Sequence, residues 1–369
     1  MEILYYFENK ETYMDMWQQV HIFDELGKHN CNIKVFSPVG YNNMYEANEE
    51  LLKYIRVNDI DLFMTPYGEE KLYIDTLKQI KKKSIPTLLI CFDNLLIPYR
   101  HKSISKYFDL VWLTSKETKN KFEQWGANII VQPYAANPYF FKPNYKDKIN
   151  KVAFVGTPYG SRVNMVNKLV NNRINTTLFT KIDSKPEKNL LRKISSKLIY
   201  NLESIYNLLK FDIGRRIILG ALKQNLLSSR KLELNSDYLE IKSQVEFSNL
   251  SKIYSNFALS LSSTSARNTG ILKNPVNVIN LRTFEIPMCG GLQFCRYFEE
   301  ISDYFEEDKE IVFYRNKEEL VEKAKFYLDE SNSNQRKKIK LAARKRALNE
   351  HTWYHRFKEI FDFFGINKC

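Results

Sequence analysis

Apolar residues in the first 132 positions alternate between short continuous runs and stretches with helical spacing. The runs predict buried strands at 2–7, 31–36, 62–64, 86–92, 111–114 and 129–132. The stretches between them predict helices at 12–29, 46–57, 70–82, 102–107 and 116–125. Strands that alternate with helices form parallel βαβ units, which bind ligands beyond the carboxyl ends of the strands. We therefore expect a Rossmann-like domain over residues 1–142.

A second α/β pattern follows a polar stretch with two prolines, Asn137 to Asn150, in which 143–150 are the expected linker. The later apolar runs predict strands at 151–156 and 254–260. Helical spacing predicts further helices at 317–328, 334–349 and 352–364. The pattern indicates a second Rossmann-like domain over 151–350, with 351–369 as a C-terminal helix.

Residues 185–232 interrupt this rhythm and predict two basic, partly amphipathic helices, near 188–209 and 213–228. The chain has a formal charge of +13, and residues 181–231 hold twelve Lys or Arg against four acidic residues. The segment is interpreted as an insertion with three alternatives: a solvated surface, a contact with anionic lipid headgroups, or a platform for an anionic acceptor. Membrane contact is favoured, since basic amphipathic helices bind anionic bilayers. Nucleic acid is not expected as a partner, because no nucleic-acid motif accompanies the charge.

The apolar runs, the first residues and the cysteine content favour a cytoplasmic protein. No run approaches the length of a membrane span, and the first residues lack the basic start of a signal peptide. The five cysteines form no CxxC pair and suit a reducing compartment. We expect a cytoplasmic location, with attachment to the inner face of the cell membrane as the alternative.

A candidate phosphate site follows the strand at 151–156. The strand ends in Gly156, a turn covers Thr157 to Gly160, and a helix starts at Ser161. Such a turn presents backbone N–H groups at a helix N-terminus, where phosphates bind. It does not have the GxGxxG spacing of dinucleotide folds. The candidate donor-binding residues here are Gly156, Thr157, Pro158, Tyr159 and Arg162.

The stretch from Asn280 to Gly291 places Arg282 and Glu285 three residues apart, on one face of a helix. A guanidinium matches phosphate oxygens, and a carboxylate accepts hydrogen bonds from ribose hydroxyls. This pair would suit a nucleotide. The alternative is an ordinary intrahelical ion pair.

Three blocks of sequence resemble the CgeB-like (spore maturation protein) glycosyltransferases, relatives of the group 1 glycosyltransferases. They are Arg282-Thr-Phe-Glu-Ile-Pro-Met-Cys-Gly-Gly with Glu310-Ile-Val-Phe-Tyr, Phe154-Val-Gly-Thr-Pro-Tyr-Gly-Ser-Arg162, and Glu350-His-Thr-Trp-Tyr-His-Arg356. The resemblance implies a GT-B fold, in which two Rossmann-like domains face a cleft that holds a nucleotide-sugar donor. It also implies that the last helix crosses back to the N-terminal domain.

By this resemblance, Glu285 holds the donor ribose and Arg282 stabilises the leaving diphosphate in place of a metal ion. Further donor-binding candidates are Asn280, Thr283, Phe284 and Lys273. Asn277 stands where group 1 enzymes carry the first glutamate of their signature. No metal or other cofactor is expected. Retention of anomeric configuration is favoured.

Acceptor contacts are expected at the carboxyl ends of the N-terminal strands. Asp93, at the exit of the strand 86–92, could act as a base, with a turn or cap as the alternative. Asn94, Glu8 and Asn9 are acceptor-binding candidates for the same topological reason. Asp59 and Asp61 precede a strand, so a metal site there is not favoured.

The predicted function is transfer of a sugar from a nucleotide diphosphate donor, a UDP- or GDP-sugar, to a hydroxyl of a bacterial surface glycan, lipid-linked glycan or protein. One alternative is a nucleotide-sugar epimerase of similar fold. The other is a non-catalytic glycan- or membrane-binding protein that keeps the fold.

Overall fold

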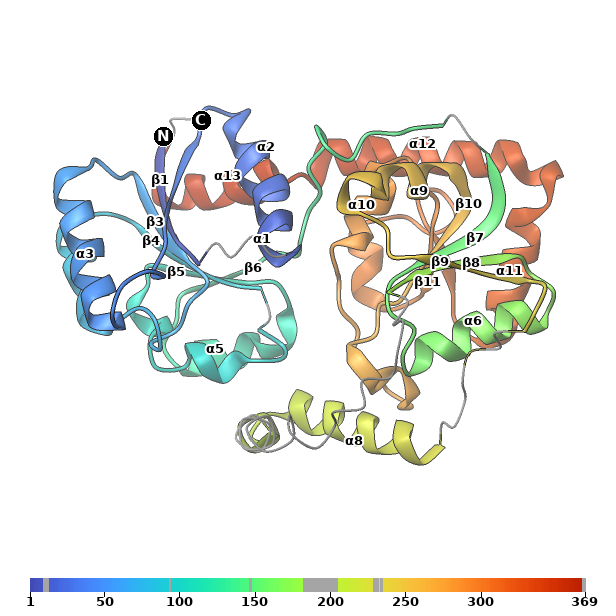
Figure 1. The fold of residues 1–369 in the computed structure, drawn as a ribbon, viewed down its shortest axis with the longest axis horizontal. Helices are drawn as coiled ribbons and strands as arrows, with labels where there is room; N and C mark the ends of the chain where they lie inside the picture. The colour runs from blue at the N-terminus through green and yellow to red at the C-terminus, as the bar shows by residue number, and fades with distance from the viewer. Residues whose placement is uncertain are drawn as a thin grey trace. The chain divides into compact units, whose positions relative to one another are not determined.

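The computed structural model describes residues 1–8, 13–92, 94–145, 148–181, 205–227, 232 and 235–366. The chain divides into two compact units, each built on its own parallel sheet. Unit 1 contains residues 1–137 and 352–369, and unit 2 contains residues 138–351. Figure 1 shows the ribbon of both units.

Unit 1 carries a six-stranded parallel sheet in the order β2-β1-β3-β4-β5-β6. Its strands are β1 (Glu2–Tyr6), β2 (Asn32–Phe36), β3 (Leu62–Thr65), β4 (Thr87–Cys91), β5 (Leu110–Leu113) and β6 (Ile129–Val131). The central strands β3, β4 and β5 are buried on both faces, which explains their continuous apolar sequences.

Helices cover both faces of this sheet. They are α1 (Tyr13–Gln18), α2 (Asp24–Gly27), α3 (Met44–Val57), α4 (Ile74–Lys82), α5 (Lys119–Gln124) and α13 (Trp353–Phe364), with one π-helical turn at Gln19–Phe23. α13 packs on unit 1 through Trp353 and Phe357, whose rings lie 5.9 and 5.4 Å from that of Trp112. The helix expected at 102–107 is wrong, since short 3-10 turns at Pro98–His101 and Ser105–Tyr107 take its place.

Unit 2 carries a second six-stranded parallel sheet, in the order β12-β11-β10-β7-β8-β9. Its strands are β7 (Ile149–Val155), β8 (Thr176–Thr180), β9 (Leu239–Ser243), β10 (Phe257–Ser262), β11 (Gln293–Arg296) and β12 (Val312–Tyr314). The apolar pattern did not predict β8, β9, β11 or β12. The strand expected at 254–260 starts only at Phe257, because Tyr254 belongs to helix α9.

The helices of unit 2 are α6 (Ser161–Asn171), α8 (Asp212–Leu227), α9 (Leu250–Asn256), α10 (Arg282–Met288), α11 (Lys317–Leu328) and α12 (Ser333–Glu350). Figure 1 shows α6 and α11 on one face of the sheet and α9, α10 and α12 on the other. In the basic insertion, residues 205–209 are helical, and α8 matches the second expected helix. Residues 185–204 and 228–231 lie outside the described residues.

No described helix combines the length and hydropathy that a membrane span needs. Cys31 is disulfide-bonded, whereas Cys91, Cys289 and Cys295 are buried free thiols.

Candidate functional site

The site in unit 2 is built around Gly156, the first residue after strand β7. Its backbone has φ +142°, a conformation that favours glycine, and its N–H group donates to the Phe179 carbonyl at 2.9 Å. Helix α6 begins at Ser161, directly after the expected turn. The strand–turn–helix arrangement predicted from the sequence is therefore confirmed, and it sets the first turn of α6 beside the carboxyl end of β7.

Two guanidinium groups converge on Gly156. Nη2 of Arg282 and Nη1 of Arg162 lie 3.8 and 3.9 Å from the point where a Cβ atom on Gly156 would stand. Arg162 belongs to α6, and Arg282 is the first residue of α10. The two meet because β10, the strand that precedes α10 in the fold, pairs directly with β7.

The surroundings of Arg162 keep its charge close to Gly156. Its guanidinium carbon lies 4.4 Å from the centre of the Tyr159 ring, and Nη1 donates to the Thr157 carbonyl at 3.3 Å. Burial lowers the pKa of Arg162 below its usual value, and the positive charge of Arg282 acts in the same direction. An anion bound between the two groups would offset this repulsion, so the geometry suits a phosphate or diphosphate.

Arg282 and Glu285 lie three residues apart on α10, as predicted. The Glu285 side chain is only 4% exposed. Burial raises the pKa of the Cys289 thiol, one helical turn further on, and the charge of Glu285 adds to this effect. Its assignment as the ribose ligand stays a prediction.

Two of the donor-binding candidates on α10 are part of the core. The side chains of Thr283 and Phe284 are fully buried. The Phe284 ring packs 5.7 Å from Tyr304 and 5.1 Å from His351, centre to centre. The assignment of Phe284 as a side-chain ligand is therefore corrected, because its ring packs α10 against the rest of the unit. The buried Thr283 Oγ1 atom has no hydrogen-bond partner, so the assignment of Thr283 stays a prediction.

The remaining candidates of unit 2 lie in loops. Thr157 and Lys273 are exposed, and Pro158 is half-buried. Asn280 donates from Nδ2 to the Ser263 carbonyl at 3.1 Å, while its buried Oδ1 atom has no hydrogen-bond partner. An acceptor left unpaired in this way is available to a hydroxyl group.

The four acceptor-site candidates in unit 1 lie in different structural settings. Asp93 and Asn9 lie outside the described residues. Asn94 is fully buried and donates to Thr118 Oγ1 at 2.6 Å and to the Ser115 carbonyl at 2.7 Å. Because its hydrogen bonds are internal, its expected contact with an acceptor is wrong. Glu8 forms an ion pair with Lys71, and its N–H group donates to Tyr67 Oη at 2.7 Å.

Within the parts of the chain that the structure describes, no three His, Cys, Asp or Glu side chains are grouped to hold a metal ion. The sequence predicted roles for Arg162 and Arg282 separately, but it did not predict that both guanidinium groups lie beside Gly156. No sequence signal joins them, since 119 residues separate them.

The two sheets and their flanking helices define the GT-B class of fold. Residues 215–362 match the family model described as glycosyl transferase-like. A glycosyltransferase from Rickettsia africae ESF-5 is 11% identical and has a TM-score of 0.59, with 98% of this chain and 97% of that chain covered.

Two further solved structures are similar in fold. Anabaena Alr3699/HepE in complex with UDP is 11% identical with a TM-score of 0.56, and the match covers 99% of this chain and 100% of that one. A protein described as a UDP-N-acetylglucosamine 2-epimerase, from Listeria monocytogenes, is 10% identical with a TM-score of 0.50, over 99% of this chain and 96% of that one. No curated protein sequence matches the chain significantly. These likenesses establish the GT-B fold.

Proposed function

We propose that the protein is a glycosyltransferase that moves a sugar from a nucleotide diphosphate donor to a hydroxyl group. The observation that carries this proposal is the convergence of Arg162 and Arg282 on Gly156. Two cations beside a helix N-terminus fit the diphosphate of such a donor. The glycosyl transferase-like match over residues 215–362 and the UDP complex of the Anabaena protein support the same class of donor.

In the proposed reaction, the bond between the anomeric carbon and the β-phosphate oxygen breaks, and a bond from that carbon to the acceptor oxygen forms. The acceptor hydroxyl loses its proton, and the nucleoside diphosphate leaves with the bonding electron pair. Arg162 and Arg282 stabilise the charge that develops on the departing diphosphate. Glu285 accepts hydrogen bonds from the ribose.

Reaction without a metal ion is part of the proposal, because the two arginines supply the positive charge that a divalent cation supplies elsewhere. Retention of configuration is proposed from the resemblance to group 1 enzymes. We also propose that the protein is related to the CgeB-like glycosyltransferases. Its acceptor is proposed to be a glycan, a lipid-linked glycan or a protein.

A donor screen tests it. Thermal unfolding is followed with UDP-, GDP-, CMP- and dTDP-sugars, each with and without EDTA. A ligand at 100 times its dissociation constant stabilises a protein by about 2.7 kcal/mol. We expect a shift with one nucleotide that EDTA leaves unchanged and that Arg282→Gln removes. No shift with any of the four, or a shift that EDTA abolishes, would contradict the proposal.

Analysis of the reaction products also distinguishes the transferase from the two alternative functions. An epimerase would convert its nucleotide sugar without any acceptor, so product analysis by mass and NMR distinguishes it from a transferase. A non-catalytic protein would bind a glycan or a membrane without consuming the donor.

We also propose that α8 attaches the enzyme to an anionic membrane surface. Leu219 and Leu222 are 55% and 56% exposed, and they share one helical face with the exposed Arg215 and Lys223. Apolar side chains flanked by basic ones suit insertion between anionic headgroups. Arg216 anchors the helix to unit 2 by donating from Nη2 to the Asn274 carbonyl at 2.6 Å.

A further inference from the structure

Helix α12 carries three basic residues at intervals of four, Arg336, Lys340 and Arg344, which therefore lie on one side of the helix. The neighbouring Lys337 and Lys338 are exposed, whereas Arg336 is buried and the other two are half-buried. Basic side chains are seldom buried unless they are paired. This side of α12 therefore needs partners within unit 2.

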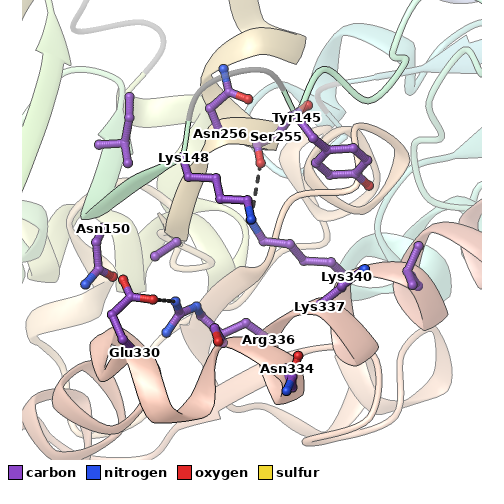
Figure 2. Close-up of a pocket in the computed structure, with 14 residues that line it drawn as sticks. Tyr145, Lys148, Asn150, Ser255, Asn256, Glu330, Asn334, Arg336, Lys337 and Lys340 are labelled. Carbon is purple, nitrogen blue, oxygen red and sulfur yellow. Dashed lines mark hydrogen bonds and ion pairs between the residues drawn. The ribbon is translucent and has the colours of Figure 1, made fainter.

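Arg336 binds the end of helix α11. Its Nη1 atom donates to the carbonyls of Tyr327 and Asp329, at 2.6 and 2.8 Å. Tyr327 belongs to the last turn of α11, and Asp329 is the residue that follows the helix. Nη2 also pairs with the Glu330 carboxylate at 3.3 Å (Figure 2). The last carbonyls of a helix have no partner within it, and here the guanidinium supplies one.

Lys340 binds the end of helix α9 in the same way. Its Nζ atom donates to the carbonyls of Phe257 and Ser255, at 2.7 and 3.2 Å. α9 ends at Asn256, between these two residues. Figure 2 shows the hydrogen bond to Ser255. Because the carboxyl end of a helix is the negative end of its dipole, a cation placed there is stabilising.

Arg344 binds the end of α10, the helix that carries the two charged donor-binding candidates. Its Nη1 atom donates to the carbonyl of Met288, the last residue of α10, and to the Phe141 carbonyl at 3.3 Å. The carbonyls of residues 285–287 accept from the backbone N–H groups of residues 289–291. Arg344 therefore completes the hydrogen bonding of the last four carbonyls of this helix.

Helix α10 depends on such contacts because it is short. It has seven residues and includes Pro287, which has no N–H group to donate to the Thr283 carbonyl. Helices of this length are not stable on their own. They are also only roughly 10 Å long. A displacement of Met288 would therefore move Glu285, one turn away, and Arg282 at the start of the helix.

We propose that Arg344 is a positioning residue for the donor: by fixing the carboxyl end of α10, it sets the positions of Arg282 and Glu285. This inference rests on the proposed function, in which those two residues bind the diphosphate and the ribose. Arg336 and Lys340 make the same kind of contact with α11 and α9, which carry no donor-binding candidate. The chain thus contains its own matched controls.

The test compares Arg344→Gln with Arg336→Gln by calorimetric titration of the full chain. The ligands are UDP, GDP and dTDP, each with its nucleoside, at a temperature well below the unfolding of every variant. Arg344→Gln should lower the affinity for both the diphosphate and its nucleoside about tenfold, because a misplaced site loses affinity at every group it holds. Arg282→Gln, in contrast, should affect the diphosphate alone.

The two remaining variants separate positioning from folding. Arg336→Gln should unfold at a lower temperature than the parent but keep the affinities of the parent, because it loosens α11 and not α10. Arg344→Lys keeps the charge and decides the question if Arg344→Gln does not fold. It should weaken binding of both ligands less, about threefold, since a single ammonium group replaces the planar guanidinium.

The inference alone is overturned if the parent binds one of the diphosphates and the Arg344 variants bind it and its nucleoside equally well. It is also overturned if Arg336→Gln weakens binding as much as Arg344→Gln, or if Arg344→Gln affects the diphosphate but not the nucleoside. If none of the three diphosphates binds the parent, the proposed function fails and this inference fails with it.

Discussion

Arg162 and Arg282 bring two guanidinium groups to the same glycine, with their nearest nitrogen atoms 3.9 and 3.8 Å from the Cβ position of Gly156. They come from the starts of two different helices, α6 and α10. Like charges this close repel each other, and a bound anion removes that repulsion. The relationship is the physical basis of the proposed donor site.

Removing either guanidinium should weaken diphosphate binding. We expect Arg162→Gln and Arg282→Gln each to lower the affinity for the nucleoside diphosphate about 10- to 100-fold, since hydrogen bonds to charged groups contribute about 1.5–3 kcal/mol. Affinity for the nucleoside without phosphates should not change. Calorimetric titration measures both. Arg100→Gln, at an exposed arginine of unit 1, is the matched control. Equal losses for nucleoside and diphosphate would contradict phosphate recognition.

Gly156→Ala should destabilise the fold. The residue has φ +142°, which a side chain rarely adopts, and the strain costs on the order of 1–3 kcal/mol. Thermal unfolding should show a fall of several degrees. Gly27→Ala is the control, because Gly27 ends helix α2 and a Cβ there meets nothing within 4 Å. That change should be neutral or slightly stabilising, and a similar loss in both variants would refute the argument from φ.

Stability should fall as the pH rises from about 4.5 toward 7, because of Glu25. Burial raises its pKa from 4.5 to about 7, although its carboxylate accepts a hydrogen bond from the Tyr354 N–H group at 2.8 Å. The folded state then binds more protons than the unfolded state between these two values. This group therefore stabilises the fold fully below pH 4.5, and its contribution is lost between pH 4.5 and 7.

The loss should amount to about 3 kcal/mol, measured by urea unfolding at a series of pH values. Glu25→Gln keeps an uncharged carbonyl for the Tyr354 N–H group, so it should flatten this part of the pH profile. An unchanged slope in that variant would assign the dependence to other groups.

The exposed face of α8 should govern membrane attachment. Leu219→Ser with Leu222→Ser should reduce cosedimentation with vesicles that contain anionic lipid, because it removes the apolar contact. Arg215→Gln with Lys223→Gln should reduce it as well, by about 1 kcal/mol per charge, and make the remaining binding less sensitive to salt. Val57→Ser, at an exposed apolar residue of unit 1, serves as the control. Equal binding of all variants would exclude this surface.

Much of the fold could be predicted because buried elements have recognisable patterns of apolar residues in the local sequence. Strands such as β3, β4 and β5 are buried throughout, so their sequences are continuous apolar runs. Four strands were missed, and three of them have less apolar sequences. β9 is an edge strand with no fully buried residue, β11 begins and ends with the polar residues Gln293 and Arg296, and β8 includes three threonines. The fourth, β12, has only three residues and was named only within the block that starts at Glu310.

The sequence by itself determined which side chains lie on one element: the turn after Gly156 and the spacing of Arg282 and Glu285 on α10 depend only on neighbours along the chain. Only the tertiary structure decided which elements meet. The pairing of β10 with β7 carries Arg282 to Arg162. Packing buries Asn94, which topology had placed among the ligands, and Phe284, which was a candidate from the family resemblance. Helical and strand periods act over a few residues, whereas strand order and burial are set by contacts between distant segments, and these leave no local pattern.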